Sequence, residues 1–298
     1  MKQLFETIRN ELPDLNVRWG EPMHNHCSFR IGGAADIFIL PRNEEELIAV
    51  LAILRREGAK PFILGNGTNL LIRDEGIRGV VIKLAAGFDS IERDGNTVYA
   101  GCGATLARIA VFAQNNSLGG MEFAHGIPGY LGGAVYMNAG AYGGEMKDIV
   151  KSVRYLNAQG EICESSENDF SYRHSRFTDG DDIILGAALE LYEADSETVG
   201  AKMRELMEKR SGSQPLDKPS AGSTFKRPVG GFAAAMIDEA GLKGYTVGGA
   251  QVSEKHAGFV INAGGASCRD VLELISHIQK TVLEKFGTEL ETEVKIIG

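Results

Sequence analysis

The sequence predicts a globular protein of mixed helices and strands, divided into two or three lobes. The chain has 298 residues, about twice the size of a typical domain, which leaves room for a sizeable buried core. Hydrophobic residues make up 43% and charged residues 24%, as in ordinary folded proteins. Segments of helical and of alternating periodicity follow one another, without an internal repeat or a low-complexity tract.

Charge and cysteine content exclude several classes of protein. The net charge of −9 gives no broad positive field, so we expect no nucleic-acid partner. The four cysteines lie far apart and form neither a disulfide framework nor a zinc pattern, so we expect reduced thiols. The first 15 residues are interrupted by charges, and no run of about 18 apolar residues follows. We therefore expect a soluble, untargeted protein without a membrane span.

In the first half of the chain, the clearest element is a helix after Pro41. Asn43 can cap it, Glu46 lies three residues further on, and the apolar stripe ends at Gly58. The other elements expected here are strands at 61–64, 79–83 and 97–101 and a helix at 104–115.

In the second half, the segment 182–191 is almost entirely apolar and is expected at the centre of a sheet. The stretch 211–222 has the composition of a linker and is the best boundary between lobes. The end of the chain alternates from 289 to 298, which predicts a half-buried strand with Glu291 and Glu293 on its polar face. The remaining expected elements are a strand at 151–157, helices at 196–210, 232–239 and 267–286, and a strand at 258–262.

Glycine is the one compositional outlier. The chain contains 38 glycines, nearly twice the usual share of roughly 7%, and 17 of them fall between residues 65 and 144. A strand that ends in Gly65–Leu70 can present free backbone N–H groups to a phosphate. The loop is neither a Walker A motif nor a Rossmann fingerprint, and a tight turn without a ligand is the alternative.

A second glycine-rich segment runs from Gly126 to Ala134. Pro128 can start a helix there, and the following glycines leave its first turns without side chains that would block an anion or a flat ring. Close helix packing also needs glycine and is the alternative. Two such loops would suit a dinucleotide better than a monophosphate.

Three further places could carry chemistry. The run Tyr172–Phe177 combines two cations with two aromatic rings, Ser223 follows a flexible Ala-Gly pair, and Glu293 lies on the expected last strand. Taken singly, they could be a solvated face, a turn hydroxyl and a surface charge. The spacing of His24, His26 and Cys27 matches no common zinc site, and no catalytic-triad signature is present.

Together these segments resemble the UDP-N-acetylenolpyruvoylglucosamine reductase family of bacterial cell-wall enzymes, in its shorter second type. The resemblance covers nearly the whole chain, from about Asn25 to Gly298. Cys27 stands where a threonine is usual, and Ala34 where a proline is usual. The motifs that carry the resemblance are SFRIGGAAD (28–36), LGNGTNLL (64–71), GIPG (126–129), NAGAYG (138–143), YR (172–173), Arg210 with QP (214–215), AGSTF (221–225) and LETEV (290–294).

The resemblance implies an α+β fold with FAD bound as in the vanillyl-alcohol-oxidase and p-cresol-methylhydroxylase type. Two FAD-binding subdomains, 1–90 and 91–210, would precede a substrate-binding lobe, 211–298, whose last strand returns toward the active site. FAD would be the cofactor, NADPH the reducing co-substrate and UDP-N-acetylglucosamine-enolpyruvate the substrate, in a cytoplasmic monomer without a metal. The same fold could instead carry an FAD oxidase of an alcohol or sugar, and a nucleotide-binding module without activity is a further alternative.

The resemblance also assigns residues to roles. Arg173 and Glu293 would polarise the carboxylate of the enolpyruvyl group, and Ser223 would protonate the carbon beside it after a hydride from flavin N5 reaches the terminal vinyl carbon. Tyr172, Arg210 and Gln214 would bind the substrate. The cofactor would be held by Gly65, Asn66, Gly67, Thr68, Asn69, Leu70, Gly126, Ile127, Pro128, Gly129, Gly132, Gly133 and Ala134, with Asn138 and Ala139 near the ring.

Overall fold

The computed structural model describes all residues, 1–298, and the chain divides into two compact units. Both units are assembled from separate stretches of sequence. The expected division into three parts with a boundary at residue 90 stays a prediction. The first unit comprises residues 1–18, 37–66 and 79–210, and the second comprises residues 19–36, 67–78 and 211–298.

The N-terminal part of the chain contributes two helices, α1 (Lys2–Glu11) and α2 (Glu44–Arg56), and a four-stranded sheet. The Asn43 side chain accepts a hydrogen bond from Glu46 N at 2.9 Å, as predicted, and the helix ends two residues before Gly58. The strands, in spatial order, are β1 (Asn16–Pro22), β2 (Ala34–Leu40), β5 (Ile77–Lys83) and β3 (Pro61–Leu64).

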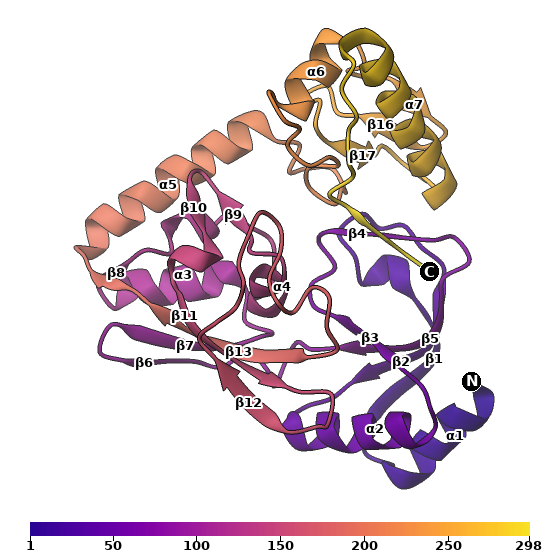
Figure 1. Ribbon diagram of the computed structural model, residues 1–298, viewed down its shortest axis with the longest axis vertical. Coiled ribbons are helices and arrows are strands. Elements are labelled where there is room, and N and C mark those ends of the chain that lie inside the picture. The colour runs from indigo at the N-terminus through magenta and orange to yellow at the C-terminus, as the bar shows by residue number, and fades with distance from the viewer. The chain divides into compact units, whose positions relative to one another are not determined.

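A five-stranded antiparallel sheet dominates the rest of the first unit (Figure 1). Its central strand, β13 (Ile183–Glu190), is buried at every position except Glu190, which confirms the prediction from its apolar run. The helices α3 (Leu106–Asn115) and α4 (Leu131–Tyr136) add apolar side chains to the same core. The other strands, in spatial order around β13, are β12 (Ile162–Ser165), β11 (Val150–Leu156), β7 (Thr97–Gly101) and β6 (Ile91–Asp94).

The second unit is built around the long helix α7 (Cys268–Phe286), which contacts α6 (Ala233–Glu239) and the small sheet beside it (Figure 1). Ser267 and Asp270 form a capping box at its start, and Gly287 ends it with a φ of 65°. The face predicted to be apolar is buried in full: Val271, Leu274, Ile275, Ile278 and Val282. The sheet contains, in order, β15 (Thr246–Val247), β16 (Ala250–Val252) and β17 (Val260–Asn262).

The predicted ends of the helix after Ser196 and of the C-terminal strand were wrong. The helix expected to end at residue 210 is α5 (Ser196–Ser213), so the first three residues of the expected linker are helical. The C-terminal strand is confined to β18 (Lys295–Ile297), which pairs in parallel with β4 (Leu70–Ile72). The predicted alternation of buried and exposed side chains is confirmed at Leu290 and Val294, which are buried. It fails at Ile296, which is 37% exposed, because the short two-stranded ladder leaves this side chain uncovered.

The remaining elements are short connections that shape the turns of the first unit and the start of the second. They are β8 (Leu118–Gly119), β9 (Gly140–Ala141), β10 (Gly144–Glu145) and β14 (Tyr192–Glu193), with the 3₁₀ turns η1 (Met23–Asn25), η2 (Glu122–Ala124) and η3 (Met146–Asp148).

Candidate functional site

The loop from Gly65 to Leu70 leaves β3 and leads into β4. Gly67 has a φ of 66°, and a Cβ there would lie 2.2 Å from the carbonyl oxygen of His26, so this glycine is required by the turn itself. The backbone N–H groups of Gly67, Thr68 and Asn69 donate to no acceptor in the structure. Three adjacent free donors suit a phosphate group, so this part of the loop fits a pyrophosphate-bearing cofactor.

The second glycine-rich segment is partly a packing device. The α4 helix begins at Leu131 and not at Pro128, because Tyr130 is extended and forms a bridge with Thr105. Leu106 N donates to Gly129 O, and Leu131 N donates to Ala104 O. A Cβ on Gly132 would lie 2.9 Å from Cys102 Cβ, so Gly132 serves close packing. No atom lies within 4 Å of a Cβ built on Gly133, which leaves this position open to a ligand.

The first unit brings the start of one glycine-rich segment next to the other. Asn66 Nδ2 donates a hydrogen bond of 2.5 Å to the carbonyl oxygen of Pro128. A Cβ on Gly65 would meet nothing nearer than Tyr130, at 3.9 Å. These contacts place Gly65 and Asn66 beside the Gly126–Ala134 segment, as two walls of one dinucleotide site would require.

Asn138 and Ala139, which stay predicted to lie near the flavin ring, both form hydrogen bonds within the protein. Both amide hydrogens of Asn138 are used, by Glu145 Oε2 at 2.9 Å and by the carbonyl oxygen of Ser171 at 3.0 Å. Ala139 donates its N–H to Ala134 and accepts from Met146 N. The sequence reasoning missed Glu145, although it closes the same glycine-rich motif.

Tyr172 and Arg173 occupy the tip of a tight turn in the first unit. Ser171 and His174 exchange backbone hydrogen bonds of 3.1 and 3.3 Å across its base, and Arg173 has a φ of 57°. The left-handed conformation is uncommon for a side chain of this size, and it often marks functional positions. The Arg173 guanidinium lies 5.3 Å from the centre of the Tyr172 ring, and Tyr172 is half exposed.

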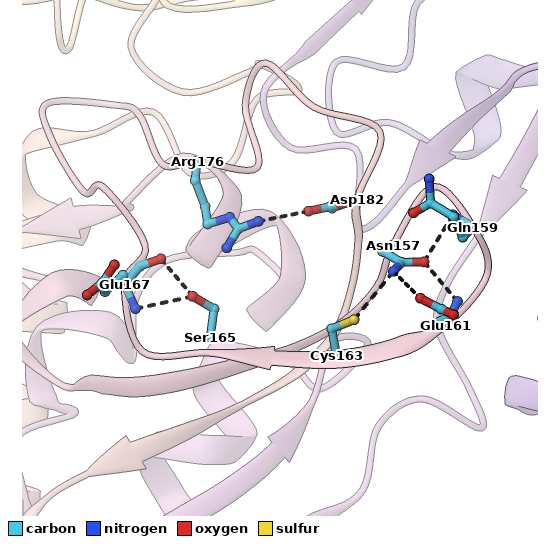
Figure 2. Close-up of polar contacts among 8 residues, drawn as sticks. All are labelled: Asn157, Gln159, Glu161, Cys163, Ser165, Glu167, Arg176 and Asp182. Atoms are coloured by element: carbon cyan, nitrogen blue, oxygen red, sulfur yellow. Dashed lines mark hydrogen bonds and ion pairs between the residues drawn. The ribbon is translucent and has the colours of Figure 1, made fainter.

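Arg176, the second cation of this run, has a structural role. Its guanidinium lies over the rings of Tyr155 and Phe177, at 5.0 and 5.4 Å. Figure 2 shows its ion pair with Asp182, with an N–O distance of 3.2 Å. Arg176 therefore stabilises the fold, and Arg173, at the tip of the turn, is the arginine that remains a candidate for the site.

The second unit brings Ser223 and Glu293 onto neighbouring backbones. Phe225 and Thr292 form an antiparallel bridge, and Glu293 N donates to the carbonyl oxygen of Thr224 at 2.9 Å. Asn69 Nδ2 donates to the carbonyl oxygen of Glu293 at 3.1 Å, which ties the glycine loop to the same segment.

The neighbouring residues Ser223 and Thr224 differ in burial and in the hydrogen bonding of their hydroxyl groups. Thr224 is buried, and its Oγ1 accepts a hydrogen bond of 3.0 Å from Val260 N. Ser223 is exposed, and its hydroxyl group forms no hydrogen bond in the structure. The fold thus holds the backbone of Ser223 through its buried neighbour and leaves the Ser223 hydroxyl available for a substrate.

Two of the expected substrate-binding residues, Arg210 and Gln214, carry polar atoms that are removed from solvent. The side-chain oxygen of Gln214 is buried and accepts no hydrogen bond, a situation that costs free energy unless a ligand or water satisfies it. Burial lowers the pKa of Arg210, and the nearby Tyr142 opposes this shift. A desolvated guanidinium favours an anionic partner. Arg210 Cδ would lie 3.0 Å from a Cβ on Gly126, so Arg210 adjoins the second glycine-rich segment.

The structure contains no group of three metal-ligating side chains, and none of its helices is both long and apolar enough to cross a membrane. The candidate residues of the two units offer backbone N–H donors without acceptors, two arginines, a carboxylate and a hydroxyl group without a hydrogen bond. Arg173 and Arg210 belong to the first unit, whereas Ser223, Glu293 and Gln214 belong to the second.

Comparisons with known proteins agree with this chemistry. Residues 35–166 match a family model described as an FAD binding domain, and residues 214–297 match the C-terminal domain of UDP-N-acetylenolpyruvoylglucosamine reductase. The reductases of Caldanaerobacter subterraneus and Clostridioides difficile are each 50% identical, over 99% and 100% of this chain and 98% of their own. The crystal structure of the Thermus caldophilus reductase superimposes with a TM-score of 0.82 and 35% identity, covering 95% of this chain and 99% of that one.

The fold and the matched domain define the protein as an α+β flavoprotein with an FAD-binding domain. The free donors at Gly67–Asn69 and the open position at Gly133 fit that cofactor. More narrowly, the chain belongs to the UDP-N-acetylenolpyruvoylglucosamine reductase family, an oxidoreductase family of peptidoglycan synthesis.

Proposed function

We propose that this chain reduces the enolpyruvyl ether of UDP-N-acetylglucosamine-enolpyruvate to UDP-N-acetylmuramate, with FAD as cofactor and NADPH as reductant. The relatives' names support the substrate class, and the FAD-binding domain supports the cofactor. When bound and reduced by NADPH, FAD would supply hydride to the terminal vinyl carbon. The cofactor's pyrophosphate would accept hydrogen bonds from the backbone N–H groups of Gly67, Thr68 and Asn69.

The protein's own task is to manage the charge that this reduction creates. Hydride addition to the vinyl carbon leaves negative charge on the neighbouring carbon and on the carboxylate. Arg173, with Glu293, would bind and polarise that carboxylate, because a preorganised cation stabilises charge as it develops. Arg210 and Gln214 would bind the diphosphate end of the substrate through a desolvated guanidinium and a buried amide.

Ser223 would then donate a proton to the carbon beside the carboxylate. The observation that carries this role is the free hydroxyl of Ser223 on a backbone fixed by the buried Thr224, next to the Glu293 segment. Serine is a weak acid in water, so its competence depends on a basic carbanion in a site that holds the hydroxyl in place.

Anaerobic titration of the purified protein tests the proposal. NADPH should bleach the flavin absorbance, and UDP-N-acetylglucosamine-enolpyruvate should restore it with formation of UDP-N-acetylmuramate. If the bleached protein regains its colour only with oxygen, releasing peroxide, and is indifferent to the enolpyruvyl substrate, then the chain is an oxidase of the same fold. A protein that binds no flavin would be a nucleotide-binding module instead.

A further inference from the structure

The buried amide of Asn138 joins three segments of the first unit. Asn138 is 1% exposed, and its backbone has a φ of 44°. Its Nδ2 donates to Glu145 Oε2 and to the carbonyl oxygen of Ser171, and its Oδ1 accepts from Lys147 N at 2.9 Å. The β9–β10 hairpin and the Tyr172–Arg173 turn are therefore attached to one side chain.

The turn that presents Arg173 needs such an anchor. It contains only four residues, from Ser171 to His174, and it holds Arg173 at a φ of 57°. A long side chain in the left-handed region persists only where its surroundings fix the backbone. The hydrogen bond from Asn138 to the Ser171 carbonyl oxygen, at 3.0 Å, fixes the base of this turn.

Glu145 supplies a fixed negative charge beside this anchor. Its carboxylate accepts from Asn138 and pairs with Lys147 Nζ at 2.9 Å, and its backbone N–H donates to Asp148 Oδ2 at 2.8 Å. Hydrogen bonding to Lys147 is the main cause of the lowered pKa of Glu145, and the positive charge of Arg173 lowers it further. Glu145 is thus ionised at neutral pH and attracts the guanidinium of Arg173.

We propose that Glu145, held by Asn138, is a positioning residue that orients the Arg173 guanidinium toward the substrate carboxylate. The inference rests on the proposed function, because it assumes that Arg173 contacts that carboxylate. Both amide hydrogens of Asn138 are committed to this arrangement, so we assign to its side chain the role of holding the Arg173 turn.

The first test replaces Glu145 by glutamine, which keeps an acceptor for Asn138 and removes the charge. We expect Glu145→Gln to lower kcat/KM for the enolpyruvyl substrate by about tenfold, within the range of coupling between neighbouring residues. Flavin content, the rate of flavin reduction by NADPH and the melting temperature should stay at wild-type values. Glu190→Gln is the matched control, because Glu190 also pairs with one lysine, Lys151, at 2.6 Å. Equal kcat/KM in Glu145→Gln and wild type would overturn the proposal.

A double-mutant cycle distinguishes positioning from a general structural effect. If Glu145 acts through Arg173, then Glu145→Gln should change kcat/KM less than twofold in an Arg173→Lys background. If the fold-changes in kcat/KM of the two single variants multiply in the double variant, the positioning role of Glu145 is overturned. The proposed function would still hold, because it depends on the activity of the wild type. If Arg173→Lys alone leaves kcat/KM unchanged, both the role of Arg173 and this inference fall. A wild type without turnover would overturn the proposed function itself.

Discussion

Replacing Ser223 by alanine separates proton donation from everything else the site does. The substitution removes one oxygen that is exposed and forms no hydrogen bond, so the free energy of unfolding should change by no more than about 0.5 kcal/mol. The buried neighbour Thr224 still anchors the backbone through Val260 N. Flavin binding and flavin reduction by NADPH should therefore survive. Loss of a positioned proton donor should slow reduction of the enolpyruvyl substrate by roughly 10²–10⁴-fold.

The assay follows flavin absorbance in a stopped-flow instrument, one half-reaction at a time. Anaerobic mixing with NADPH reports the first half-reaction, and mixing of reduced protein with the enolpyruvyl substrate reports the second. Only the second should slow in Ser223→Ala. Ser223→Cys should recover part of the rate, because a thiol is a stronger acid than a hydroxyl group.

Thr224→Val is the contrasting control on the adjacent hydroxyl. It leaves Val260 N without its acceptor in a buried position, which should cost about 1–3 kcal/mol of stability. Its melting temperature should fall. The backbone hydrogen bonds of Thr224 with Gly258 O and Glu293 N remain, so its reoxidation by substrate should slow far less than that of Ser223→Ala. If Ser223→Ala reoxidises as fast as wild type, Ser223 is not the proton donor.

Three further predictions address the cofactor site, the Arg173 turn and the core of the second unit. Gly133→Asp should reduce FAD affinity in a fluorescence titration, whereas Gly212→Asp, in an equally open helical position, should not; equal affinities would remove Gly133 from the cofactor site. The hydrogen bond to Asp179 raises the pKa of His174, so any stability from this pair is present below pH about 6.5 and is lost as pH rises through the raised pKa. Asp179→Asn should lower that pKa in an NMR titration, and an unchanged pKa would refute the pairing. Ile278→Ala, which empties a fully buried position on α7, should cost about 2–5 kcal/mol in chemical unfolding, and a cost below 1 kcal/mol would mean that the helix face is not packed as described.

Local patterns predicted most of the regular elements. The cap at Asn43, the apolar face of α7 and the buried run of β13 depend on residues close together in the sequence, so their spacing was sufficient. Boundaries shifted where distant segments competed for the backbone. The α4 helix starts late because residues 104–106 pair with residues 129–131, and β18 is short because residues 291–293 pair instead with residues 224–226.

The glycines illustrate the same division. Composition located two glycine-rich segments. It could not tell a ligand-binding glycine from a packing glycine, because either a ligand or protein atoms can occupy the space that a side chain would fill. The structure separates two neighbouring ones: a Cβ on Gly132 would meet Cys102, whereas a Cβ on Gly133 would face open space. Likewise, the sequence marked both Arg173 and Arg176, and the contacts with Tyr155 and Asp182 assign Arg176 to the fold.

By itself, the sequence determined the family, the two glycine-rich segments and the residue types of the candidate site, because ordered motifs and periodicity are properties of the chain. Only the tertiary structure decided which hydroxyl is free, that Ser223 and Glu293 lie on neighbouring backbones, and that Asn138 bonds both Glu145 and the base of the Arg173 turn. Those facts depend on hydrogen bonds between residues far apart in the chain. A donor or acceptor becomes available to a ligand only when folding leaves it without a partner.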